Sequence, residues 1–210
     1  MYLTIILLAF VFFIFFRFKA LKKEEQETIE SFWEREQKAN FSPKKDLSNL
    51  SYITIPFEKF PQTYIDSEEE KMFSELKTFS DKKILNLNGL SNTDLKEQYG
   101  VANLNTLEEI GDNFDSMSKI IAEIAEKRFE IKDYSVVITL LEFLVSKKTD
   151  LSKAYIILGD AYSETNKYSK IPDLITIVKE LHLPLEKKIL DSLSSHLKKI
   201  EKENIEIPDL

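Results

Sequence analysis

The chain has 210 residues, no cysteine, two histidines and a net charge of −7. Without cysteine it has no thiol nucleophile, no disulfide and no Cys-ligated metal site, and two histidines leave little material for acid–base chemistry. The negative charge argues against bulk electrostatic binding to nucleic acid. Only four glycines and six prolines are present, which argues against an all-β sandwich or barrel. The composition favours an all-α protein that needs no cofactor.

Residues 2–16 form an uncharged, aromatic-rich run. As a helix this run covers about 23 Å, and residues 17–21 extend it toward the ~30 Å of a bilayer core because Arg17 and Lys19 can snorkel to the interface. We therefore expect one transmembrane anchor over residues 1–21, with residues 2–21 contacting the lipid bilayer.

Two other interpretations of this run are a cleaved signal peptide and a buried core helix. A signal peptide would have basic residues before the run and a small-x-small site after it, and the sequence has neither. The basic residues follow the span instead, at Arg17, Lys19, Lys22 and Lys23. Basic flanks stay cytoplasmic, so we expect a single-pass protein of the cell membrane with its N-terminus outside and its C-terminal domain cytoplasmic.

Residues 22–45 are predicted to form a juxtamembrane helix that ends before Ser42-Pro43. Helical spacing places Ile29, Phe32, Trp33 and Glu36 on one face. Trp33 could lie at the membrane interface or dock on the following domain, and its distance from the span favours docking.

Residues 46–110 are predicted to form an extended connector followed by capping helices. Prolines within residues 47–63 favour a packed, extended path, and Asp66 caps a helix that begins with a run of three glutamates. We expect these glutamates, at positions 68–70, to form a solvated face rather than a metal site. Residues 84–105 are predicted to form a compact helix–turn–helix, with a cap at Ser91 or Thr93 and turns at Gly89 and Gly100.

The strongest pattern is a repeat, because windows 118–151 and 152–185 align without a gap at a period of 34. Each window predicts two antiparallel helices with apolar stripes, and the helix at 186–202 is expected to cap the second pair. We place a helical-repeat domain at residues 111–204. A generic antiparallel helical bundle is the alternative.

The repeat resembles the tetratricopeptide (TPR) family, whose period is 34. In the second window the positions of the family's signature residues are occupied by Tyr155, Leu158, Gly159, Ala161, Tyr162 and Tyr168, and in the first by Ile121, Ile124, Ala125 and Tyr134. The first window departs from the pattern at Arg128, where the family prefers Tyr. Together with the anchor, the chain resembles membrane-anchored TPR proteins of Gram-positive bacteria, a family without an assigned activity.

This resemblance implies a membrane-tethered scaffold or adaptor that binds a protein or peptide. We do not expect an enzyme, because acid–base chemistry would have to proceed without help from cysteine or histidine, and glycine-poor loops offer no cradle for phosphates. A structural subunit of a permanent membrane complex is the alternative function. The groove-facing positions of a TPR map to Lys119, Ala122, Glu126, Phe129, Glu130, Lys153, Ile156, Asp160, Ser163 and Glu164. Their mixture of acids and apolar residues favours a partner segment that carries basic and apolar side chains.

Overall fold

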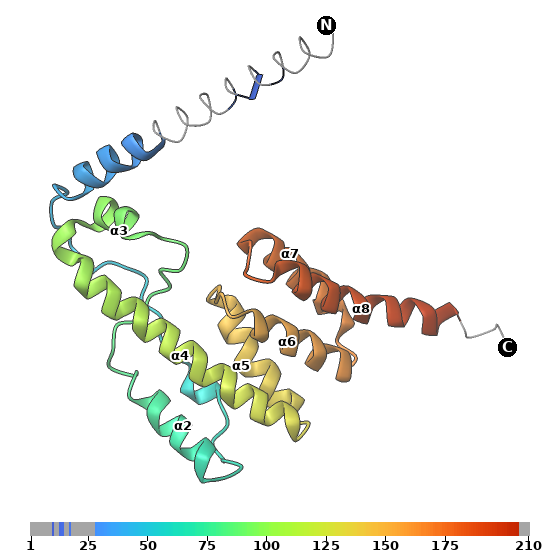
Figure 1. The fold of residues 1–210 in the computed structure, drawn as a ribbon. Coiled ribbons are helices and arrows are strands. Elements are labelled where there is room, and N and C mark those ends of the chain that lie inside the picture. Colours follow the sequence, from blue (N-terminus) through green and yellow to red (C-terminus); the bar gives the residue numbers. More distant parts are fainter. Residues whose placement is uncertain (1–9, 11–12, 15–16, 18–27, 206–210) are drawn as a thin grey trace, which may run out of the picture. The chain divides into compact units, whose positions relative to one another are not determined.

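The computed structural model describes residues 10, 13–14, 17 and 28–205. Residues 28–205 form eight α-helices, and no β-strand is present in the described part of the chain. The expectation of an all-α protein is thereby confirmed (Figure 1). The helices are 28–39, α2 (Ser67–Lys77), α3 (Asn92–Tyr99), α4 (Leu104–Glu130), α5 (Tyr134–Ser146), α6 (Ser152–Glu164), α7 (Ile171–Leu181) and α8 (Glu186–Ile205).

The chain divides into two compact units. Described residues up to Asn49, together with Leu90–Leu107, form unit 1, while Leu50–Gly89 and the residues from Glu108 onward form unit 2. The predicted transmembrane run falls almost entirely outside the described residues. Among the residues that are described, no helix combines the length and apolar character needed to cross a membrane.

Unit 1 is held together by contacts between the helix at 28–39 and α3. The Nη2 atom of Arg35 lies 2.6 Å from Oδ1 of Asp94 and 2.5 Å from Oε2 of Glu97. The carboxylate of Glu36 accepts hydrogen bonds from Lys96 and Thr93. The capping residue of α3 is Ser91 and not Thr93, because the Ser91 hydroxyl accepts the N–H of Asp94 in a capping box.

Trp33 lies on the same helix as Arg35 and is 63% exposed. The expected docking of Trp33 is therefore not observed. The helix contacts α3 through polar side chains nearer its C-terminal end, and this contact leaves the indole uncovered.

Unit 2 begins with an extended connector that leads into α2. As expected, Asp66 caps α2 by accepting the N–H groups of Glu68 and Glu69, and Phe73 and Leu76 face the core. The predicted solvated face of three glutamates is wrong at Glu69, which is fully buried. The charge of its carboxylate is compensated by Arg128 of α4, whose Nε–H donates a 2.6 Å hydrogen bond to Oε1 of Glu69. The two residues lie 59 positions apart in the sequence.

Helix α4 is longer than the repeat window predicts, since the helix begins at Leu104 and the window only at Ser118. The apolar spacing of the window continues backward through Leu107, Ile110, Phe114 and Met117, which are all buried. No proline interrupts this stretch, so the helix extends over both segments.

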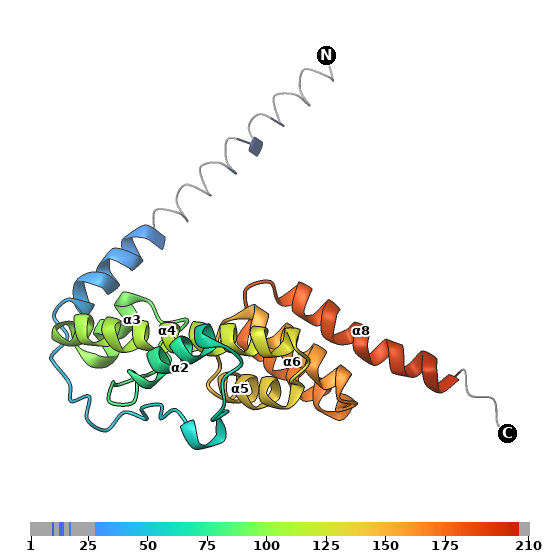
Figure 2. The same cartoon turned by 90° about the horizontal axis from the view of Figure 1, so that it is seen from below.

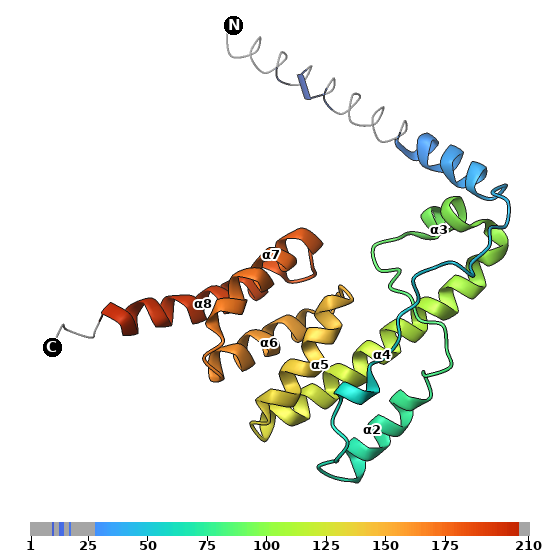
Figure 3. The same cartoon turned by 180° about the vertical axis from the view of Figure 1, so that it is seen from behind.

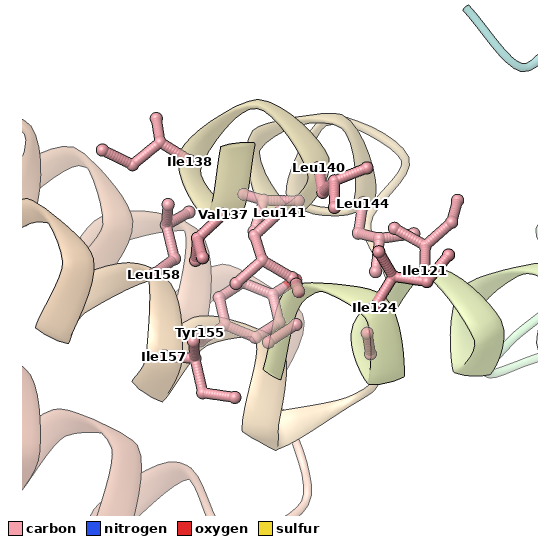
Figure 4. Packing of buried hydrophobic residues seen from close by; sticks show 14 of the residues in the cluster. Ile121, Ile124, Val137, Ile138, Leu140, Leu141, Leu144, Tyr155, Ile157 and Leu158 are labelled. Atoms are coloured by element: carbon pink, nitrogen blue, oxygen red, sulfur yellow. The ribbon is translucent and has the colours of Figure 1, made fainter. Parts of the chain in front are cut away.

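The core of unit 2 is formed where α4, α5 and α6 meet. Figure 4 shows side chains of these three helices gathered around Tyr155, whose hydroxyl donates a 2.8 Å hydrogen bond to the carbonyl of Thr149. Because buried Tyr hydroxyls need a partner, this bond satisfies the one polar atom of the ring. The core residues labelled there are Ile121, Ile124, Val137, Ile138, Leu140, Leu141, Leu144, Tyr155, Ile157 and Leu158.

Helix boundaries and turns in unit 2 recur at the spacing of the sequence repeat. Helices α6 and α8 begin at Ser152 and Glu186, and α4 and α6 end at Glu130 and Glu164. The left-handed turn residues recur at the same interval, Lys132 with Asn166 and Lys148 with His182. The period found in the sequence is therefore also a period of the backbone.

The helices α6, α7 and α8 pack on one another, and α8 extends past the end of α6 (Figure 2). A Cβ placed on Gly159 of α6 would overlap the Cδ2 methyl of Leu193 on α8. This close approach explains why a glycine occupies a helix interior, where it is otherwise unfavourable.

Replacing Gly159 by leucine is expected to destabilise unit 2 by about 1–3 kcal/mol or more, because a large side chain enters a packed interface. Thermal unfolding followed by circular dichroism measures the loss. Gly111→Ala is the matched control, since an added Cβ there meets Leu87 at an ordinary 3.6 Å and alanine favours a helix. An unchanged melting temperature for Gly159→Leu would contradict the packing of α6 on α8.

Candidate partner-binding face

A hollow of about 180 Å³ lies between α4 and the start of α6. Its walls combine lysine and glutamate side chains with two apolar residues, namely Lys119, Ala122, Glu123, Glu126, Leu151 and Lys153. Four of the ten predicted groove residues thus line one hollow. Its mixed lining can accommodate an apolar side chain beside a charged one.

Two of the four acidic groove positions contact a second helix through charged side chains. Glu126 of α4 forms an ion pair with Lys153 of α6, and Asp160 of α6 lies 2.8 Å from the Nε2 atom of His196 on α8. Glu126 and Asp160 occupy equivalent positions in the two repeat windows, whereas their partners do not, because Lys153 corresponds to Lys187 and not to His196. Since Glu126 and Lys153 are both substantially exposed, their ion pair contributes little stability and can be exchanged for a partner's charge.

The other predicted positions do not share this hollow. Phe129 packs edge-on against Tyr134 with ring centroids 5.3 Å apart, and the Tyr134 hydroxyl donates a 3.4 Å hydrogen bond to Glu164. Ile156 and Ser163 are half-buried on α6, while Glu130 is exposed where α4 ends. Phe129 and Glu164 therefore contact Tyr134 at the turn between α4 and α5.

Two of the larger hollows flank α5, and the sequence does not predict them. One, of about 420 Å³, lies between the connector and α5 and is lined by Pro56, Phe60 and Phe143 among others. The second, of about 310 Å³, lies between α5, α6 and α7. Groove positions were inferred only for the first helix of each repeat, and these hollows are lined mainly by second helices and the connector.

Glu142 links three elements at the edge of the second hollow. It accepts a 2.8 Å hydrogen bond from Tyr162 and forms an ion pair with Lys170. Although burial acts against its charge, the bonds from Lys170 and Tyr162 lower the pKa of Glu142. Burial, and then the bond to Glu142, raises the pKa of Tyr162. The carboxylate thus stays ionised, and the tyrosine stays protonated, at neutral pH.

In the described residues, no group of three or more His, Asp or Glu side chains is placed to hold a metal ion. Comparisons with protein families, with curated proteins and with solved structures find no match to this chain.

Proposed function

We propose that the chain is a membrane-tethered interaction module in which TPR-like repeats bind a protein segment on the face formed by α4, α6 and α8. The observation that carries this proposal is the recurrence, at the repeat period, of helix boundaries and left-handed turns. A period of 34 is that of the TPR, and stacked repeats typically present extended binding surfaces.

The chemistry of the hollow supports a partner that carries both basic and apolar side chains. Glu123 and Glu126 line it beside Ala122 and Leu151. An apolar side chain of the partner can therefore contact Ala122 and Leu151. A lysine or arginine of the partner can replace Lys153 at the Glu126 carboxylate. The uncharged run at residues 2–16, followed by four basic residues, supports a membrane anchor with the repeats on the cytoplasmic side.

The double charge reversal Glu126→Lys with Asp160→Lys is expected to abolish capture of the partner, because it places positive charge where the partner's basic residues bind. Pull-down from membranes with quantitative mass spectrometry measures the loss. Glu75→Lys with Glu180→Lys is the control, since it changes net charge equally at exposed positions on α2 and α7, outside the proposed face. An identical set of captured proteins for both variants would contradict binding on this face.

Alkaline carbonate is expected to leave the full chain in the membrane pellet, because an apolar span of about 20 residues is held by the bilayer core. A C-terminal tag should resist external protease in intact cells and become sensitive after permeabilisation. Extraction by carbonate would contradict the anchor, whereas cleavage of the tag in intact cells would contradict the orientation alone.

A further inference from the structure

The helix at residues 28–39 carries three large apolar side chains that are exposed to solvent. Ile29, Phe32 and Trp33 are 49%, 52% and 63% exposed. Their spacing of three and four residues places them on one helix face, and the rings of Phe32 and Trp33 meet edge-on with centroids 5.5 Å apart. These residues form one apolar surface, which we call the aromatic stripe.

The same helix is fixed within unit 1 by its C-terminal half. Arg35 and Glu36 bind α3 through charged hydrogen bonds, and Ala39 is fully buried. Figures 1 and 3 show α3 beside the C-terminal end of this helix. Since α3 is contacted nearer that end, the aromatic stripe stays uncovered on the side toward the N-terminus.

The length of chain before this helix restricts which apolar surface can cover the stripe. Leu21 ends the proposed anchor and lies seven residues before Thr28, a separation that spans at most about 25 Å when fully extended. The bilayer surface therefore stays within reach of the stripe, and tethering gives it a high effective concentration there. Trp and Phe are side chains that favour the membrane–water interface.

The charges around the stripe are compatible with an uncharged lipid surface. Residues 17–39 contain six lysines or arginines and six glutamates, so this stretch carries no net charge. Contact with zwitterionic headgroups therefore depends on burial of the apolar side chains rather than on charge. The tether favours the bilayer over a second copy of this helix, because the anchor holds only the bilayer close to the stripe.

We propose that the aromatic stripe inserts into the interfacial layer of a zwitterionic bilayer beside the anchor and holds unit 1 at the membrane surface. This inference rests on the membrane anchor of the proposed function. It adds a second membrane contact, made by described residues outside the anchor, that orients the first folded unit toward the lipid.

Trp33 is the only tryptophan in the chain, so its fluorescence reports the stripe directly. The full chain is reconstituted into phosphatidylcholine vesicles, with or without lipids brominated near the top of the acyl chains. We expect blue-shifted emission and at least twofold quenching by the brominated lipids. Ile29→Ser with Phe32→Ser should reduce the quenching at least twofold. Phe41→Ser, which changes an exposed aromatic outside the stripe, should leave it unchanged.

Vesicle flotation in the same samples separates this inference from the anchor. A chain that floats and whose Trp33 is quenched supports the inference. A floating chain with red-shifted, unquenched emission would place Trp33 in water, and blue-shifted but unquenched emission would place it against protein. Either result contradicts insertion of the aromatic stripe into the bilayer but agrees with the membrane anchor. A chain that does not float overturns both.

Discussion

Replacing Arg128 by methionine is expected to destabilise unit 2 by about 3–5 kcal/mol, because it leaves a buried carboxylate without its counter-charge. Arg128 is 6% exposed and Glu69 is 0% exposed. The guanidinium donates to both Glu69 oxygens at 2.6 and 2.8 Å and to the carbonyl of Thr63 at 2.6 Å. Burial acts against the charge, yet the bonds to the carboxylates of Glu69 and Asp133 raise the pKa of Arg128.

Urea unfolding of the full chain in detergent, followed by circular dichroism, measures this loss. The double variant Glu69→Leu with Arg128→Met removes both charges and should recover part of the stability, since apolar residues can replace a buried ion pair. Recovery should be incomplete, because the N–H of Ile65 loses its 2.6 Å hydrogen bond to Glu69. A single Arg128→Met variant as stable as the parent chain would contradict the buried pair.

Replacing Gly100 by alanine is expected to disrupt unit 1. Gly100 has a φ of +89°, a conformation that costs a non-glycine residue about 1–3 kcal/mol. The new Cβ would also lie 2.7 Å from the Cα of Lys44 and closer still to the carbonyl of Pro43. Both neighbours are backbone atoms, so the clash cannot be relieved by a side-chain rotation.

Amide hydrogen exchange of residues 92–103 measures the disruption, since α3 and the turn after it should lose protection. Gly89→Ala is the matched control, because Gly89 also has a positive φ but a Cβ there meets nothing within 4 Å. We expect Gly89→Ala to keep protection in that segment. Equal protection in Gly100→Ala and the parent chain would contradict the close approach of residues 43–44 to Gly100.

Local signals in the sequence predicted much of the helical architecture. The cap at Asp66, the break before Pro43 and the repeat period of 34 each depend on residues close in sequence. These features recur in the structure as the start of α2, the end of the first helix and the spacing of α6 and α8. The start of α4 before the repeat window can also be predicted from the sequence, since Leu107, Ile110 and Phe114 continue the apolar spacing of the window.

Contacts between distant residues could not be predicted in the same way. Nothing near Glu69 indicates that Arg128, 59 residues later, compensates its charge. A glutamate at that position is typical of a solvated helix start. In the sequence, Arg128 is only a departure from the TPR pattern, whereas in the structure it binds Glu69 on α2. The hollows beside α5 likewise depend on where the connector packs.

Site-specific photocrosslinking in the native membrane tests the proposed binding face most directly. A photoreactive residue at Lys119, in the hollow between α4 and α6, should form an adduct with a defined protein. The same probe at exposed Lys179 on α7 should not capture that protein. The adduct at position 119 should disappear in the Glu126→Lys with Asp160→Lys variant. Equal capture from both positions, or an adduct that survives the charge reversal, would contradict an interaction module that binds on the face of α4, α6 and α8.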